Sequence, residues 1–264
     1  MRYCGIDVSA RPGNQQLVTL HERRTGGEPE LVATFYAPGD VDAVARTVLG
    51  FGREAVVAVD APSARRLDLL GASAALRVAL GLPAGRYEQH RVCDALLFGR
   101  GLPLYPVAAD SATARRGWER WVEVGFEVHA ALEELGPYRP HEPGALEGPV
   151  GPGALRFGRV TESYPDAVFC VLLGHRPPPK RTPWGLQQRI AALRLRGVVD
   201  ADGGLWHRTL DELDACALAY AAFGLAAGAG CWAGDAREGV VVLPGTELLE
   251  RYEPLPPPAR QPLA

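Results

Sequence analysis

Residues 3–9 of the chain read Tyr-Cys-Gly-Ile-Asp-Val-Ser, and residues 55–62 read Ala-Val-Val-Ala-Val-Asp-Ala-Pro. Both are apolar runs typical of buried strands, and each ends at an aspartate, Asp7 or Asp60. An ionised carboxylate removed from water costs several kcal/mol unless it is paired, hydrogen-bonded or bound to a metal. The two aspartates are therefore either satisfied structural groups or ligands.

The segments around these two strands predict the order β-β-β-α-β. We expect strands near 3–9, 16–21, 31–37 and 55–60, and a helix near 40–51. Arg-Pro-Gly-Asn at 11–14 and Thr-Gly-Gly-Glu at 25–28 are typical of hairpin connections, and Pro38-Gly39-Asp40 ends a strand and caps the helix. The first third of the chain is thus expected to be a sheet with one helix.

The rest of the chain predicts a helical insertion followed by a return to the sheet. Residues from about 62 to 154 have mainly helical patterns, including Trp118 to Leu135, and end in a Pro/Gly-rich run at 136–153 that we expect to be mobile. Strand character returns at 155–163 and 239–243, with helices near 164–173, 184–196 and 209–227. We predict one α/β domain over residues 1–252 and a disordered, Pro-rich tail at 253–264.

The composition is that of an ordinary globular protein. The 264 residues, 47% of them hydrophobic, suffice for a sizeable core, and a net charge of −3 provides no global basic field for nucleic acid. Five cysteines without a Cys-x-x-Cys pair argue against a disulfide framework or zinc site and favour the cytoplasm. The uncharged stretch from Ala215 to Gly234 is rich in Ala and Gly, so we expect a core helix ending near Gly228, not a membrane span.

The start of this helix, Thr-Leu-Asp-Glu-Leu-Asp at 209–214, adds further carboxylates. Thr209 and Glu212 match a capping box, and Asp211 suits the positive end of the helix dipole. Asp214 lies three residues after Asp211 on the same helix face, and capping explains it less well.

Glu162 ends another expected strand, where a solvated glutamate is also common. Acids that converge at one point repel one another and have raised pKa values unless a cation neutralises them. All-oxygen ligation suits Mg²⁺ or Mn²⁺ better than zinc, and two such ions about 4 Å apart can hold the attacking and leaving oxygens of a phosphodiester displacement. Water is then the nucleophile, and no serine, cysteine or histidine nucleophile is required.

The chain resembles the domain-of-unknown-function family 429, whose members are regarded as predicted nucleases of ribonuclease-H-like fold. The motifs that carry the resemblance run in order from residue 5 to residue 244. They are Gly5-Ile6-Asp7-Val8-Ser9, Val59-Asp60-Ala61-Pro62, Arg91-x-Cys93-Asp94, Glu162-Ser-Tyr-Pro165, Lys180 with Gly185 and Arg189, Asp211-x-x-Asp214-Ala215, and Glu238-Gly-Val-Val-Val-Leu-Pro244. The resemblance implies a mixed sheet flanked by helices and a metal-dependent hydrolase acting on nucleic acid.

The resemblance further implies which residues form the site. Its implied ligands of Mg²⁺ or Mn²⁺, expected as two ions, are Asp7, Asp60, Asp211 and Asp214. Glu162 would supply another carboxylate or position the nucleophilic water.

Lys180 is the only lysine among 28 basic residues, and it is either a contact to the scissile phosphate or a solvated loop residue. Six basic residues and no acid lie between Arg176 and Arg196. We expect this stretch to track the backbone of DNA or RNA, or to be a solvated helix face. Arg91 and Asp94, spaced i to i+3, are expected to form a salt bridge within the insertion.

Two other interpretations remain open. An actin-like nucleotide-binding ATPase or phosphotransferase also carries Gly-x-Asp on its first strand, although here Ala61-Pro62 replaces a glycine-rich phosphate loop. A non-catalytic module of the same fold would bind a partner through the insertion. Bound nucleotide would support the first, and absence of metal binding the second.

Overall fold

The structure is a computed structural model that describes residues 1–11, 13–24, 29–83, 87–102, 107, 117–142 and 144–255. In this part of the chain, nine strands form one mixed sheet with the order β5-β8-β9-β6-β4-β1-β2-β3-β7. The strands are β1 (Tyr3–Asp7), β2 (Gln15–Arg23), β3 (Glu30–Gly39), β4 (Val56–Val59), β5 (Glu147–Pro149), β6 (Val160–Glu162), β7 (Val198–Asp200), β8 (Gly230–Asp235) and β9 (Gly239–Pro244). The predicted α/β class is confirmed.

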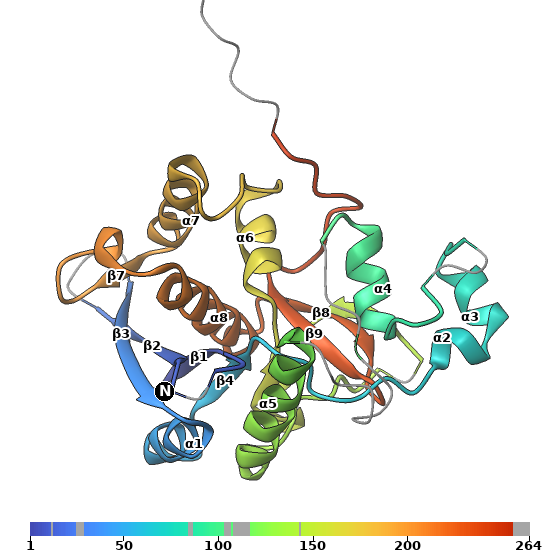
Figure 1. The fold of residues 1–264 in the computed structure, drawn as a ribbon, viewed down its shortest axis with the longest axis horizontal. Helices are drawn as coiled ribbons and strands as arrows, with labels where there is room; N and C mark the ends of the chain where they lie inside the picture. Colours follow the sequence, from blue (N-terminus) through green and yellow to red (C-terminus); the bar gives the residue numbers. More distant parts are fainter. Residues whose placement is uncertain are drawn as a thin grey trace, which may run out of the picture.

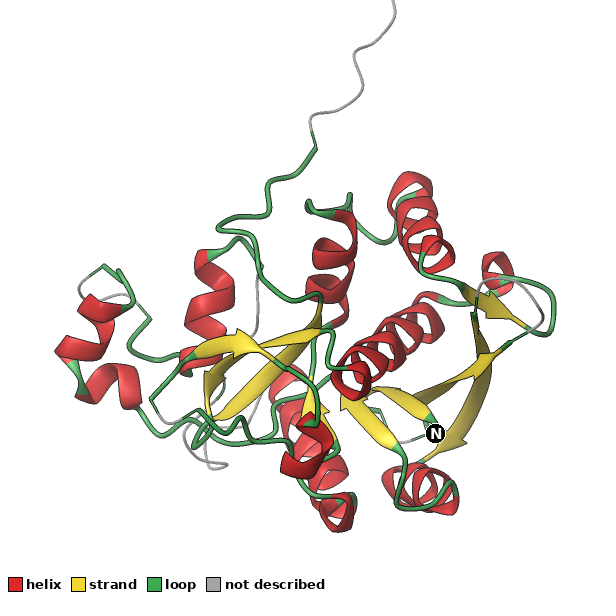
Figure 2. Cartoon of the chain, turned by 180° about the vertical axis from the view of Figure 1, so that it is seen from behind, coloured by secondary structure: helices red, strands yellow, loops and turns green. Residues whose placement is uncertain are grey.

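Helices cover both faces of the sheet. They are α1 (Val41–Gly50), α2 (Leu69–Ala72), α3 (Ala74–Ala79), α4 (Val92–Gly99), α5 (Gly117–Ala131), α6 (Pro165–Leu173), α7 (Pro183–Leu195) and α8 (Leu210–Ala227). Figure 1 shows α6, α7 and α8 on one side of the strands and α1 and α5 on the other. Seen from behind, helices again lie on both sides of the sheet (Figure 2). Each face therefore has its own apolar core.

The expected order β-β-β-α-β at the start of the chain is confirmed, and each boundary falls within a few residues of its predicted position. Strand β1 pairs with β2 in antiparallel and with β4 in parallel orientation. Strand β6 then pairs with β4 in parallel orientation. Because β1, β4 and β6 run in the same direction, their carboxyl ends meet at one edge of the sheet, and this edge carries Asp7, Asp60 and Glu162.

Helix α8 lies directly on β1 because residue 5 is glycine. A Cβ at Gly5 would collide with the backbone carbonyl oxygen of Ala215 and the backbone nitrogen of Ala219. The predicted capping box of Thr209 and Glu212 is present, and the helix ends at Gly228, whose φ of 66° is left-handed. This contact places the first turns of α8 beside the end of β1.

The segment between β4 and β6, which we expected to be an insertion, packs against the core of the protein and adds a strand to the sheet. A Cβ at Gly125 of α5 would collide with the side chain of Ala61, so α5 packs tightly on the loop after β4. Strand β5 pairs with β8 at the edge of the sheet. Helices α2 and α3 lie at the periphery (Figure 1).

Several boundaries differ from expectation. Residues 155–163 contain a 3-10 helix at Ala154–Phe157 and only a short strand, β6, while Glu147–Pro149 within the run expected to be mobile is strand β5. Strands β7 and β8 were not expected. The sequence of β8, Gly-Cys-Trp-Ala-Gly-Asp, has the glycines of a loop, and its antiparallel pairing with β9 makes it a strand.

The chain still contacts the rest of the domain beyond residue 252, where we expected the domain to end. The backbone N–H of Arg176 donates to the carbonyl of Glu253 at 3.0 Å, and Tyr252 is buried. Residues 256–264, the greater part of the tail expected to be disordered, lie outside the described residues. None of the described helices combines the length and the apolar character needed to cross a membrane.

Candidate active site

Four aspartates from three parts of the chain form an acidic cluster, which we define as Asp7, Asp60, Asp211 and Asp214. Asp7 is the last residue of β1, and Asp60 follows β4, where its backbone N–H donates to the carbonyl of Ile6 at 2.9 Å. Asp211 and Asp214 lie in the first turns of α8. Asp60 and Asp214 line one pocket, so the sheet edge and the helix start face one another.

Protons bind strongly to this cluster. Burial, followed by the charges of Asp214 and Asp211, raises the pKa of Asp7 to about 8. Burial, with the charges of Asp7 and Asp214, raises the pKa of Asp60 well above its ordinary value. A side-chain hydrogen bond between the two lowers the pKa of Asp7 and raises that of Asp60. The carboxylates are therefore short of positive charge.

Lys180 supplies one cation. Its Nζ lies 2.5 Å from Oδ2 of Asp214, and its side chain is 38% exposed while that of Asp214 is 3% exposed. Burial alone would lower the pKa of Lys180, but the charge and hydrogen bond of Asp214 outweigh burial and raise it. Burial still raises the pKa of Asp214 to about 6 in spite of Lys180. One ammonium group thus does not neutralise the cluster.

The second oxygen of Asp214 is the feature that fits a metal ion. Oδ1 is buried and has no hydrogen-bond partner among the described residues. A buried carboxylate oxygen in that state is costly, and a hard divalent cation with oxygen ligands would satisfy it. The aspartates do not all approach within 4.8 Å of one another, since the one described set of three possible ligands with that spacing lies elsewhere.

A pocket of about 280 Å³, here called the Lys180 pocket, opens onto the cluster. Its lining residues are Asp60, Trp121, Tyr164, Pro165, Asp166, Lys180 and Asp214. The loop that carries Lys180 is held by Arg189, whose Nη1 donates to the carbonyl of Pro178 at 2.9 Å and whose Nη2 lies 2.7 Å from Oδ1 of Asp166. Lys180 is thus fixed between α6 and α7, next to Asp214.

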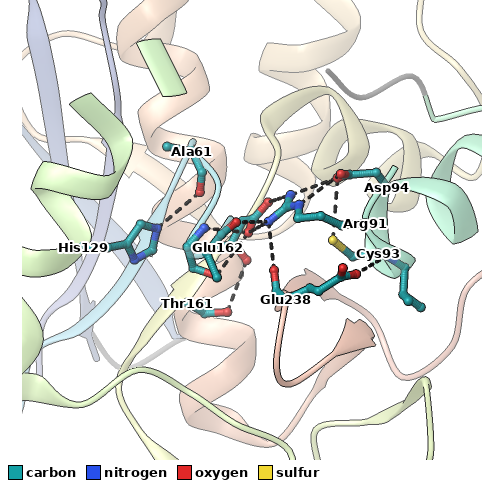
Figure 3. A network of polar contacts seen from close by, with 11 residues as sticks. Ala61, Arg91, Cys93, Asp94, His129, Thr161, Glu162 and Glu238 are labelled. Atoms are coloured by element: carbon teal, nitrogen blue, oxygen red, sulfur yellow. Dashed lines mark hydrogen bonds and ion pairs between the residues drawn. The ribbon is translucent and has the colours of Figure 1, made fainter. Parts of the chain in front are cut away.

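Glu162 belongs to a second, adjacent group of buried carboxylates, shown in Figure 3. Its Oε1 accepts from Nη2 of Arg91 at 2.6 Å, and its Oε2 accepts from Nη1 of Arg91 at 2.8 Å and from the backbone N–H of Ser63 at 2.9 Å. Glu162 lines, together with Asp60, a small pocket of about 20 Å³. Both of its oxygens are engaged, so the structure places Glu162 beside the acidic cluster but bound to an arginine.

The expected salt bridge between Arg91 and Asp94 is present and buried, with Nε and Nη2 of Arg91 donating to the two carboxylate oxygens at 3.0 and 2.9 Å. Glu238 completes the group. Its carboxylate accepts from the backbone N–H groups of Leu67 at 2.7 Å and Val92 at 3.1 Å. We call Arg91, Asp94, Glu162, Glu238 and Ser63 the Arg91 network.

Both of these buried groups lie within one stretch of the chain that matches a known family. Residues 5–238 match the family described as "Protein of unknown function (DUF429)". The chain belongs to the DUF429 family. No curated protein and no solved structure matches the chain.

The DUF429 protein has one more geometric candidate for a cation, inside the Arg91 network. Ligand atoms of Cys93, Asp94 and Glu162 all lie within 4.8 Å of one another. Arg91 already supplies the positive charge for both carboxylates, and burial raises the pKa of the Cys93 thiol well above its ordinary value. A cation there would have to displace a fully paired guanidinium, so the acidic cluster is the better site.

His129 supports the loop after β4. Its Nε2 lies 3.2 Å from the carbonyl oxygen of Ala61, and burial lowers its pKa to about 4, so the imidazole is neutral and donates there. Sequence patterns alone did not single out His129 or the role of Glu238, because both act on backbone groups of distant segments.

The basic stretch from Arg176 to Arg196 does not form one strip at the pocket. Lys180 lines the pocket and Arg189 is buried against Asp166. Arg194 and Arg196 lie at the far end of α7, roughly 20 Å from its start at the usual helical rise. Binding of nucleic acid along this stretch stays a prediction.

Proposed function

We propose that this DUF429 protein is a nuclease that hydrolyses phosphodiester bonds of nucleic acid with Mg²⁺ or Mn²⁺. The observation that carries the proposal is Oδ1 of Asp214, a buried carboxylate oxygen without a partner among the described residues, beside two further aspartates with raised pKa values. Burying several carboxylates together costs free energy unless a cation offsets their repulsion. That cost is expected where the acids serve a bound ion.

In this proposal Asp7, Asp60 and Asp214 hold the ions, with Asp211 at the exposed end of the cluster. The bound ions would stabilise the negative charge that develops on the phosphoryl oxygens. The ions would compete with the protons that the raised pKa values of Asp7 and Asp60 favour. Lys180 has the exposure and the position in the pocket to contact a phosphate oxygen as a point charge while it orients Asp214.

A ribonuclease-H-like arrangement is the finer fold class that we propose. It is supported by the initial order β1, β2, β3, α1 and β4 and by acids at the ends of the first and fourth strands. Strands β6, β9, β8 and β5 extend the sheet beyond β4, and β7 extends it beyond β3. In this proposal Glu162 serves the Arg91 network and holds the loop after Asp60.

The proposal is tested by incubating labelled DNA and RNA, single-stranded, duplex and branched, with Mg²⁺, Mn²⁺ or chelator. The parent is compared with Asp60→Asn, which keeps size and shape but removes a ligand charge. We expect metal-dependent cleavage that falls at least about 100-fold in the variant, as for loss of a group that stabilises a transition state.

Asp202→Asn is the matched control, because this aspartate is 79% exposed and lies outside the pocket. Its cleavage rate should equal that of the parent. If no substrate is cut and neither ion raises the melting temperature, the proposal is wrong and a non-catalytic module takes its place.

A further inference from the structure

The Lys180 pocket has aromatic walls as well as a charged end. We propose that it binds an unpaired nucleotide base, so that the substrate is single-stranded or locally unwound nucleic acid. This inference rests on the proposed function, because the same pocket opens onto the acidic cluster. It adds the substrate class, which the carboxylates alone do not specify.

Trp121 and Tyr164 form these walls. Trp121 lies on α5, which Gly125 brings against the loop after β4, and Tyr164 is the residue before α6. Both side chains are half-buried, and both line the Lys180 pocket together with Pro165. They also line the small pocket beside Arg91, so they stand between the acidic cluster and the Arg91 network.

The size of the pocket limits what it can accept. At about 280 Å³ it lies just below the range of roughly 300–1,000 Å³ typical of small-molecule pockets. A group the size of one nucleotide suits that volume. In a duplex, neighbouring bases cover the faces of each base, so an aromatic side chain reaches a base face only where the base has left the stack.

The distribution of polarity in the pocket matches a nucleotide. Lys180, Asp60 and Asp214 form one end, where a phosphate and its metal ions would lie, and the rings of Trp121 and Tyr164 provide surfaces for a base. Stacking on aromatic rings tolerates every base, because each base has a π-face. The pocket therefore predicts preference for strand structure with little preference for sequence.

The test measures binding separately from cleavage. Fluorescently labelled oligonucleotides of one sequence are prepared as a single strand, as a duplex and as a single strand of abasic nucleotides. Their dissociation constants are measured by anisotropy with Mg²⁺ and the Asp60→Asn protein, alone and with Trp121→Ala added. We expect the single strand to bind more tightly than the duplex, and Trp121→Ala to weaken single-strand binding about 5- to 150-fold, as the loss of one stacked base implies.

Trp206→Ala is the matched control, since Trp206 is 52% exposed in the 3-10 helix Leu205–His207 and does not line the pocket. It should leave binding unchanged, and neither tryptophan variant should affect the abasic strand. Trp121→Phe and Trp121→Leu decide the matter if Trp121→Ala does not fold. The ring of Phe should retain most of the binding, whereas Leu should lose it.

The inference is overturned if duplex binds as tightly as single strand, or if Trp121→Ala and Trp121→Leu match Trp206→Ala. Cleavage by the parent together with either result removes the inference and leaves the proposed function standing. Conversely, the binding of single strands can depend on the ring at position 121 while no metal-dependent cleavage occurs. That result leaves the inference standing and removes the proposed function.

Discussion

The acidic cluster and the Arg91 network are neighbouring groups of carboxylates. They differ in how completely their carboxylate oxygens are hydrogen-bonded or paired with a cation. In the Arg91 network, the oxygens of Asp94, Glu162 and Glu238 accept from a guanidinium or from backbone N–H groups. In the acidic cluster, one lysine faces several acids and Oδ1 of Asp214 has no partner among the described residues. Asp214 is buried as deeply as Asp94 and Glu162, so what separates the candidate site from the structural group is whether the carboxylate oxygens have hydrogen-bond partners.

The difference also separates what each group contributes to stability. A paired and hydrogen-bonded carboxylate is costly to unpair, because its partner is left charged and buried. An unneutralised cluster already carries that cost in the folded protein. Removing the cation of the Arg91 network should therefore destabilise the protein, whereas neutralising the acidic cluster should stabilise it. Three measurements of stability test this contrast, and they are given from the largest expected effect to the smallest.

Removing the cation of the Arg91 network should destabilise the protein most. Arg91→Met leaves Asp94 and Glu162 buried without their counterion, and we expect a loss of about 3–5 kcal/mol in the free energy of unfolding, measured with urea. Arg237→Met is the control, because Arg237 is 67% exposed and pairs with Asp235 at the surface. A loss below about 1 kcal/mol in Arg91→Met would contradict the contrast between the groups.

Adding a divalent ion should stabilise the acidic cluster. At a concentration one hundred times its dissociation constant, Mg²⁺ or Mn²⁺ should contribute about 2.7 kcal/mol, which raises the melting temperature of a protein this size by roughly 5–10 °C. Asp214→Asn should abolish the rise. Cys93→Ala should leave it intact, and loss of the rise in Cys93→Ala would place the ion in the Arg91 network instead.

Raising the pH should weaken the metal-free protein through Asp7. Its pKa of about 8 in the folded state lies above the ordinary value of 3.8, so the folded state binds the proton more tightly. The stabilisation is complete below about pH 4 and is lost as the pH rises through about 8, at up to about 1.4 kcal/mol per pH unit from one group. Asp7→Asn should make this decline shallower in chelator, measured by urea unfolding across pH, and leave the part that Asp60 contributes.

Asp202→Asn is the control for the pH series and should keep the slope of the parent. An equally steep decline in Asp7→Asn would show that another group binds the proton. Saturating Mg²⁺ should also reduce the slope in the parent, because the ion takes the place of the proton.

Local patterns in the sequence predicted the parts of the site that depend on local geometry. Apolar runs ending in Asp7 and Asp60 gave two strands whose parallel pairing brings both acids to one edge, and the capping box fixed the start of α8. The i to i+3 spacing predicted the pairing of Arg91 with Asp94. Nothing local pointed to the pairing of Arg91 with Glu162, which lies 71 residues away.

Contacts between a side chain and the backbone of a distant segment could not be predicted from the sequence either. Glu238 satisfies amides of Leu67 and Val92, and any residue offers such an amide, so no pattern identifies the partner. Strand β8 was missed for a related reason, since pairing with β9 overrides the loop-like glycines of its sequence.

The position of Glu238 also has a consequence for synthesis of the chain on the ribosome. Its carboxylate binds the amide of Leu67, which is made 171 residues earlier. At about 5–20 residues per second, roughly 10–30 s pass between the two. During that interval the segment after Asp60 lacks the acceptor that anchors it, so the Arg91 network is complete only when the hairpin of β8 and β9 has been synthesised.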